Sequence, residues 1–135
     1  MKVLVSSCLM GIPCRWHGKP VPYSSFLKKH RETNPDDIFI GVCPEMLGGL
    51  PCPRPPVKRR KGKVFETCAK KTNRKNVTGA EVTQFFIDGA GKTLEIAREH
   101  KIKKAFLCNW SPSCDKSGIT GKLLILNGIE VVNIW

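Results

Sequence analysis

Short apolar runs recur along the chain and predict β-strands. They are partly β-branched, and turn residues such as Gly, Pro, Asn and Asp lie beside them, which is the usual pattern of buried strands. The runs cover residues 2–7, 38–42, 63–65, 104–107 and 129–134.

Between these runs, apolar residues recur at helical spacing after residue 81, which predicts a long amphipathic helix. They are Val82, Phe85, Phe86, Ala90, Leu94 and Ala97. Thr78-Gly79-Ala80-Glu81 fits a capping box, so we expect this helix to begin there and to run to about residue 100. Residues 119–126 predict another helix, and residues 23–32 predict a short polar one.

Glycine and proline interrupt the pattern of strands and helices at two places. Gly89 and Gly91 weaken the long helix and indicate close packing on the sheet. Residues 47–56 carry two Gly and four Pro, which predicts an irregular loop. Strands that alternate with helices indicate an α/β fold, with a mainly parallel sheet covered on both faces.

Length and composition favour one domain over residues 1–135, because hydrophobic residues make up 41% and charged residues 25%. No run approaches the roughly 20 apolar residues of a membrane span, so no membrane partner is expected. The apolar stretch before Cys8 is too short for a signal peptide, which indicates the cytoplasm. In that reducing compartment, seven cysteines favour metal binding or catalysis over disulfides.

Four of the cysteines lie at or just beyond the ends of predicted strands. Cys8 and Cys43 directly follow two strands, Cys108 ends a third, and Cys114 lies six residues further on. The carboxyl ends of parallel strands share one edge of a sheet, so these thiols are expected to meet there. Buried cysteines that only fill the core remain the alternative. The chain has no Cys-x-x-Cys pair of the zinc-knuckle type, and thiols from separate loops suit a larger [4Fe–4S] cluster.

Other polar side chains lie close to these cysteines in the sequence. Glu45 follows Cys43 by two residues and is the candidate acid or base, and Ser111 and Ser113 could donate hydroxyl hydrogen bonds. The net charge is +12, and residues 54–75 hold ten Lys or Arg and one acid. That segment is either a solvated surface or a landing site for phosphate or RNA.

At these positions the chain resembles the thiouracil desulfidase (TudS) family. Residues 5–18 resemble its first signature, residues 42–56 its second, and residues 111–114 followed by 118–121 its third; the helix start at residues 82–90 also matches. The chain departs from the family pattern at Trp16-His17, where Tyr-Asp is frequent, and at Asp115, where Gly is common. Its loop between Cys114 and Gly118 is also shorter.

The resemblance implies a Rossmann-like three-layer fold and a [4Fe–4S] cluster held by Cys8, Cys43 and Cys114. It implies a non-redox exchange of sulfur for oxygen in thiouracil, thiouridine or its nucleotide, with release of sulfide. An open iron would act as a Lewis acid, and Glu45 would take a proton from water, assisted by a serine. The candidate substrate-binding residues are Arg15, Arg54, Ser111 and Ser113. The expected partner is a small thiolated pyrimidine, its nucleotide or a thiolated RNA, and no obligatory protein partner is expected.

Two other functions are compatible with the residues alone. A dithiol oxidoreductase could use Cys8 with Cys14, or Cys108 with Cys114, although the usual Cys-x-x-Cys is missing. A non-catalytic RNA-binding module could use the basic segment, but it would leave the cysteines unexplained.

Overall fold

A four-stranded parallel sheet forms the centre of the molecule in the computed structural model, which describes residues 1–67 and 79–135. Its strands are β1 (Lys2–Ser6), β2 (Ile38–Val42), β5 (Lys104–Cys108) and β6 (Glu130–Ile134). Their order across the sheet is β2-β1-β5-β6. The predicted α/β fold with a mainly parallel sheet is therefore confirmed, and so is each of these four strands to within two residues.

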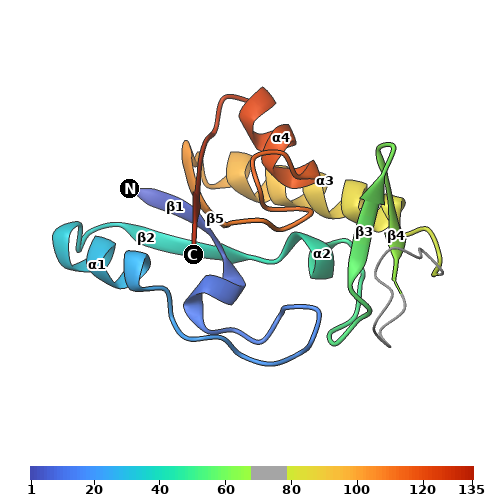
Figure 1. Cartoon of the computed structure of the whole chain (residues 1–135). Coiled ribbons are helices and arrows are strands. Elements are labelled where there is room, and N and C mark those ends of the chain that lie inside the picture. Colours follow the sequence, from blue (N-terminus) through green and yellow to red (C-terminus); the bar gives the residue numbers. More distant parts are fainter. Residues whose placement is uncertain (68–78) are drawn as a thin grey trace.

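Helices cover both faces of the sheet (Figure 1). On one side lies α1 (Ser25–Thr33), and on the other lie α3 (Thr83–Glu99) and α4 (Ile119–Leu126). The β1 segment Val3-Leu4-Val5 is fully buried between these layers, together with Leu27 of α1 and Leu124 of α4. Both faces of β1 therefore contribute to the core, as expected for a parallel strand.

A two-stranded hairpin stands beside the start of α3 (Figure 1). It consists of β3 (Val57–Arg60) and β4 (Lys63–Glu66), which pair antiparallel. Lys61 and Gly62 both have positive φ, at 49° and 79°, as a tight two-residue hairpin turn requires. The Val82 amide donates to the Val64 carbonyl at 2.8 Å, so the hairpin is attached to the start of α3.

The structure corrects three local expectations. The long helix begins at Thr83, because Glu81 still pairs with Phe65 as an extended residue; Thr78 lies outside the described residues. A short helix, α2 (Pro44–Leu47), which the sequence did not predict, lies between β2 and the predicted loop, with Pro44 at its first turn. Residues 48–56 of that loop form neither helix nor strand, as expected. Strand β3 was not expected from the sequence, because its residues are mostly charged and only pairing with β4 makes them a strand.

The glycines of α3 pack differently from the prediction. A Cβ atom on Gly89 would lie 1.8 Å from the Pro44 carbonyl oxygen, so this glycine allows α3 to approach α2 and not the sheet. Gly48, at the end of α2, is the corresponding position on that helix, since a Cβ there would lie 1.9 Å from the Phe85 carbonyl oxygen of α3. A Cβ on Gly91 would meet no described atom within 4 Å. The contact between α2 and α3 fixes the segment that directly follows β2.

The strand order has a switch point between β1 and β5. From β1 the chain goes on to β2 on one side, and from β5 to β6 on the other. Ligands of open α/β sheets bind outside the carboxyl ends of the strands at such a point. Among residues 1–67 and 79–135, no helix is both long enough and apolar enough to cross a bilayer.

Candidate active site

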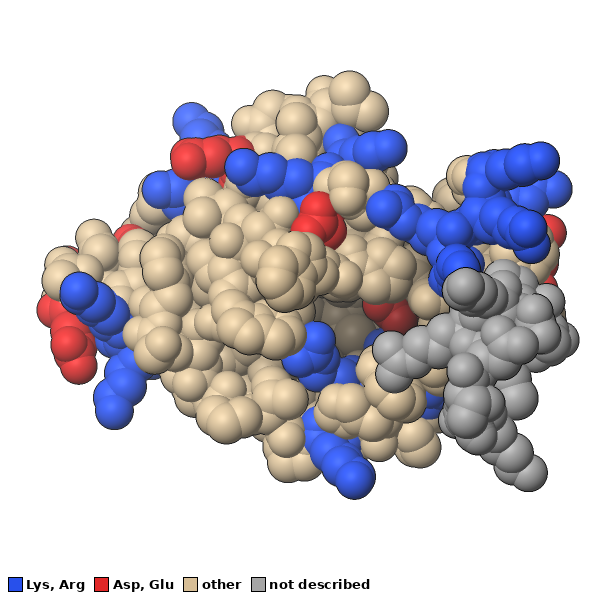
Figure 2. All heavy atoms as spheres, viewed as in Figure 1, with Lys and Arg blue, Asp and Glu red and all other residues tan. Residues whose placement is uncertain are grey.

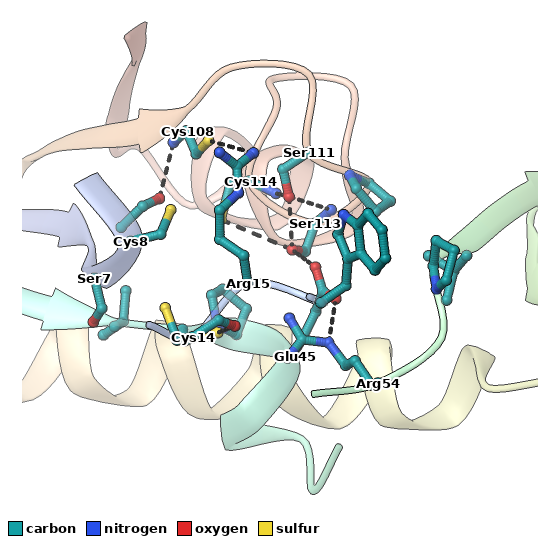
Figure 3. A pocket seen from close by; sticks show the side chains of 18 of the residues that line it. Ser7, Cys8, Cys14, Arg15, Glu45, Arg54, Cys108, Ser111, Ser113 and Cys114 are labelled. Carbon is teal, nitrogen blue, oxygen red and sulfur yellow. Dashed lines mark hydrogen bonds and ion pairs between the residues drawn. The ribbon is translucent and has the colours of Figure 1, made fainter. Parts of the chain in front are cut away.

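A cavity of about 390 Å³ opens at the carboxyl ends of β1, β2 and β5. Figure 3 shows the side chains that converge on it, and in Figure 2 it is the hollow that exposes an acidic group at its base. Five thiols contribute to its wall: Cys8, Cys14, Cys43, Cys108 and Cys114.

The three predicted ligands reach this cavity from three different segments. Cys8 lies in a 3₁₀ turn, Ser7–Met10, directly after β1, and Cys43 lies between β2 and α2. Cys114 lies in the loop that follows β5 and is 5% exposed. The structure therefore brings together the thiols that the sequence placed at one edge.

Two further cysteines join them, and one does not. Cys108 is the last residue of β5, and Cys14 lies beyond the 3₁₀ turn. The Cys52 thiol instead donates to the carbonyl oxygens of Pro13 at 3.1 Å and Arg15 at 3.2 Å, outside the cavity wall. Cys68 lies outside the described residues.

Crowding and burial perturb these thiols. The hydrogen bond with Cys108 raises the pKa of Cys8 to about 12, and the same contact lowers the pKa of Cys108. Burial raises the pKa of Cys114 to about 11, and contact with Cys14 raises that of Cys43. Several thiolates can coexist in so small a space only if a cation compensates their charge.

The donor set suits a cluster better than a single ion. Within the described part of the chain, no three His, Cys, Asp or Glu side chains stand close enough together to hold one metal ion. The ligands of an iron–sulfur cluster bind different irons and therefore stand further apart. Of the six such side chains that line the cavity, five are cysteines, which are the usual ligands of such clusters, and the sixth is Glu45.

Glu45 lies in the first turn of α2, beside these thiols, and both of its carboxylate oxygens accept hydrogen bonds. Arg54 Nε donates to Oε1 at 3.0 Å, and the Ser113 hydroxyl donates to Oε2 at 3.0 Å. Figure 3 shows this chain of contacts along one side of the pocket. The cavity thus combines a carboxylate with a cation and a hydroxyl, which is an arrangement suited to proton transfer.

The remaining predicted residues also line the cavity. The Ser111 hydroxyl lies 3.1 Å from that of Ser113 and accepts from the Cys114 amide at 3.1 Å. Arg15 reaches inward to the Cys108 thiol at 3.8 Å, with its guanidinium 5.0 Å from the centre of the Trp135 ring. Arg54 is 8% exposed and forms an ion pair with Glu45, a contact that the sequence did not indicate.

Several cavity residues were missed by sequence reasoning. The Ser6 hydroxyl accepts from the Cys108 amide at 2.9 Å and so joins the ends of β1 and β5. Trp16 and Trp110 also line the cavity. The position of Ser6 at a strand end was an available signal, whereas nothing in the local sequence of the tryptophans placed them at this site.

Comparison with known proteins identifies the family. The model of the family described as 2-thiouracil desulfurase matches residues 3–133. The chain belongs to this family. The resemblance noted in the sequence is thereby confirmed.

Two individual proteins extend the comparison across the family. The chain is 31% identical over 146 residues to a protein of Bacillus subtilis described as uncharacterized protein YbbK, covering 97% of this chain and 94% of the relative. It also resembles the solved structure described as [4Fe–4S]-dependent thiouracil desulfidase TudS, with a TM-score of 0.79 and 30% identity. That match covers 98% of this chain and 89% of the other. The thiol pocket thus belongs to a chain with the fold of a desulfurase family.

Proposed function

We propose that this protein is a [4Fe–4S]-dependent desulfidase that replaces the sulfur of a thiolated pyrimidine by oxygen. The observation that carries the proposal is the convergence of Cys8, Cys43 and Cys114 beside the Glu45–Ser113 pair, in a chain of the 2-thiouracil desulfurase family. Water supplies the oxygen, and sulfur departs as hydrogen sulfide, so the reaction needs no net electron transfer.

The three cysteines from separate segments are the proposed cluster ligands. Three thiolates leave one iron without a protein ligand, and when bound the cluster supplies a Lewis acid that polarises the carbon–sulfur bond. Cys14 and Cys108 complete the wall around the three ligands. Free thiols at a functional site also fit the reducing cytoplasm, in which we place the protein.

The side chains around the cavity orient the water and the ring. Glu45 accepts a proton from the attacking water, and Arg54 holds the carboxylate in place through its 3.0 Å contact. Ser113 donates to the other carboxylate oxygen and can turn toward Ser111, which lies 3.1 Å away. That rotation would free Oε2 of Glu45 to accept a proton.

A matched pair of cysteine variants tests the ligand assignment. After anaerobic purification, we expect the wild type to contain iron and acid-labile sulfide, to absorb visible light, and to convert 2-thiouracil or 4-thiouracil to uracil with release of sulfide. Cys43→Ala should lose iron and activity, because one of three ligands is gone. Cys52→Ala should keep both, because that thiol lies outside the cavity wall.

Two results would contradict the proposal. Full iron and turnover in Cys43→Ala would disprove the assignment of that ligand. A colourless wild-type protein that forms reversible disulfides would favour a dithiol oxidoreductase instead.

We further propose that the preferred substrate carries phosphate. The β3–β4 hairpin presents exposed basic side chains, which gather beside the hollow in Figure 2. They are Lys58, Arg59, Arg60, Lys61 and Lys63. Val57, at the start of this hairpin, itself lines the cavity. A free thiouracil is neutral and gains little from these charges, whereas Lys and Arg bind phosphate well.

Charge neutralisation on the hairpin tests this preference. In the triple variant Lys58→Gln, Arg60→Gln, Lys61→Gln, we expect KM for a thiouridine monophosphate to rise several-fold while the free base is little affected. Arg59 is left in place because its Nη1 donates to the Ser117 carbonyl. The wild-type preference should shrink as salt rises.

The control removes three charges elsewhere, through Lys29→Gln, Lys92→Gln and Lys103→Gln, at exposed positions apart from the cavity lining. This variant should keep the wild-type preference for the nucleotide. Equal kcat/KM for base and nucleotide in wild type at low salt would reject the proposal and leave the hairpin a solvated surface.

A further inference from the structure

Trp110 is a large aromatic side chain left almost fully in solvent at the mouth of the cavity. It lines the cavity, yet it is 82% exposed. It lies two residues beyond the end of β5, on the same loop as Ser111, Ser113 and Cys114. The proposed chemistry gives it no part, because the thiols and Glu45 lie deeper.

The backbone holds Trp110 in this position against its preference. Its φ is 59°, in the left-handed region that bulky residues rarely adopt. The Trp110 amide donates to Asp115 Oδ2 at 2.9 Å, and Oδ1 accepts from the amide and hydroxyl of Ser117 at 3.0 and 2.9 Å. Asp115 therefore closes the loop around Trp110, and its pKa is lowered by these hydrogen bonds.

Aromatic and cationic groups continue outward from Trp110. The Trp135 ring, 62% exposed, lies 6.5 Å from the Trp110 ring between centroids, and Arg15 covers it from the cavity side. The basic hairpin meets the same loop, because Arg59 Nη1 donates to the Ser117 carbonyl at 2.6 Å. An exposed aromatic surface thus stands next to a basic one at the entrance.

This combination fits a nucleic acid strand. Aromatic side chains stack on bases whatever their identity, and a neighbouring basic surface follows the phosphates. A pyrimidine whose sulfur reaches the buried thiols occupies the inner part of the cavity. The base nearest to an exposed ring at the rim is then that of the next nucleotide.

We propose that Trp110 forms an outer subsite that stacks the base adjacent to the thiolated one, so that the substrate is a single-stranded oligonucleotide. The inference rests on the proposed desulfidase function and extends it to the substrate class. In it Trp110 is a binding residue, and Asp115 is a positioning residue that acts through the loop.

The test compares a thiouridine monophosphate with a dinucleotide of thiouridine and unmodified uridine. We expect the wild type to have the higher kcat/KM for the dinucleotide, and Trp110→Ala to reduce that advantage by about 5–150-fold, as the loss of one base–aromatic stack would. Trp110→Phe should retain most of the advantage, because it keeps an aromatic face.

A second exposed apolar residue supplies the matched control. Leu126, at the end of α4, is also 82% exposed. Leu126→Ala should leave kcat/KM unchanged for both the monophosphate and the dinucleotide. An unchanged dinucleotide advantage in Trp110→Ala would overturn the subsite. Equal losses in Trp110→Ala and Leu126→Ala would overturn it too, because the effect would then not be specific to the ring.

Binding measured without chemistry separates this inference from the proposed function. We expect calorimetry to show that unmodified uridylyl-uridine binds the wild type more tightly than uridine monophosphate does, and that Trp110→Ala removes the difference. If uridylyl-uridine binds more tightly in this Trp110-dependent way but no thiolated substrate is turned over, the desulfidase proposal is wrong and the outer subsite is supported. If the two bind equally to wild type, the subsite fails whatever the turnover.

Discussion

Glu45 has no oxygen free in the structure, and that fact bears on how it could act. One oxygen accepts from Arg54 and the other from Ser113, each at 3.0 Å. The Arg54 side chain is almost fully buried, so its contact with Glu45 also satisfies a charge that water cannot reach. The Ser113 hydroxyl is the partner that can be exchanged, since Ser111 offers it a second acceptor.

Glu45→Gln tests the proton-accepting role of this carboxylate. The amide keeps nearly the same shape and an oxygen for Arg54, but it cannot take a proton from water. We expect iron content near wild type and a kcat reduced by about 10²–10⁴-fold, which is the typical contribution of general acid–base catalysis. Iron assays and steady-state turnover on the same preparation check this, and undiminished kcat would leave Glu45 a structural residue.

On the scale of the elements, the position of α2 depends on close packing. It carries Glu45, and it approaches α3 so closely that Gly48 and Gly89 have no room for a Cβ. In both cases the obstacle is a backbone carbonyl oxygen, which cannot turn aside as a side chain could. The position of the candidate base is therefore set by a contact between two helices.

Gly89→Ala should separate these helices. We expect a loss of about 1–3 kcal/mol in the free energy of unfolding, as overpacking typically costs, and a fall in kcat as Glu45 moves. Gly91→Ala is the control on the same helix, where a Cβ meets no described atom within 4 Å. It should stabilise the protein by about 0.5–1 kcal/mol, because alanine favours the helix. The free energies of unfolding of both variants can be measured with denaturant. Equal values would show that the close contact between α2 and α3 is not needed for stability.

On the scale of the whole molecule, the cavity and a small cluster of charged groups lie at opposite edges of the sheet. The cavity lies at the carboxyl ends of the strands, whereas Asp37 lies just before β2 at the amino edge. Asp37 accepts from His30 Nε2 at 2.8 Å and lies 3.1 Å from the amino terminus of Met1. The hydrogen bond with His30, supported by the terminal amine, lowers the pKa of Asp37.

Asp37→Asn should therefore lower thermal stability in a pH-dependent way without affecting turnover. A carboxylate whose folded pKa is lowered stabilises the protein above its unfolded pKa of about 3.9, and that contribution is lost as pH falls through the folded value. We expect wild type to have the higher Tm at pH 6–7, the difference to shrink as pH falls below about 3.9, and to vanish once the pH is below the lowered folded pKa of Asp37. Tm values of both proteins across that range, with turnover at pH 7, test this. A difference that persisted at low pH would show that the charge of Asp37 is not its cause.

The sequence by itself determined the local framework of this protein. The apolar runs specified the four parallel strands, because burial on both faces leaves a recognisable pattern, and they placed Cys8 and Cys43 directly after two strand ends. The sequence also predicted the helices that the structure shows at residues 83–99 and 119–126. The signature motifs identified the family, and the match to the family model confirmed it.

Only the tertiary structure decided what those segments do to one another. It brought Cys14 into the wall of the cavity, paired Arg54 with Glu45, and gave the charged β3 a partner in β4. It also moved the start of α3 to Thr83 and turned Gly89 toward α2. Each of these outcomes depends on a contact between residues separated in sequence. Local propensity and spacing carry no information about such contacts until the sheet has fixed the ends of its strands side by side.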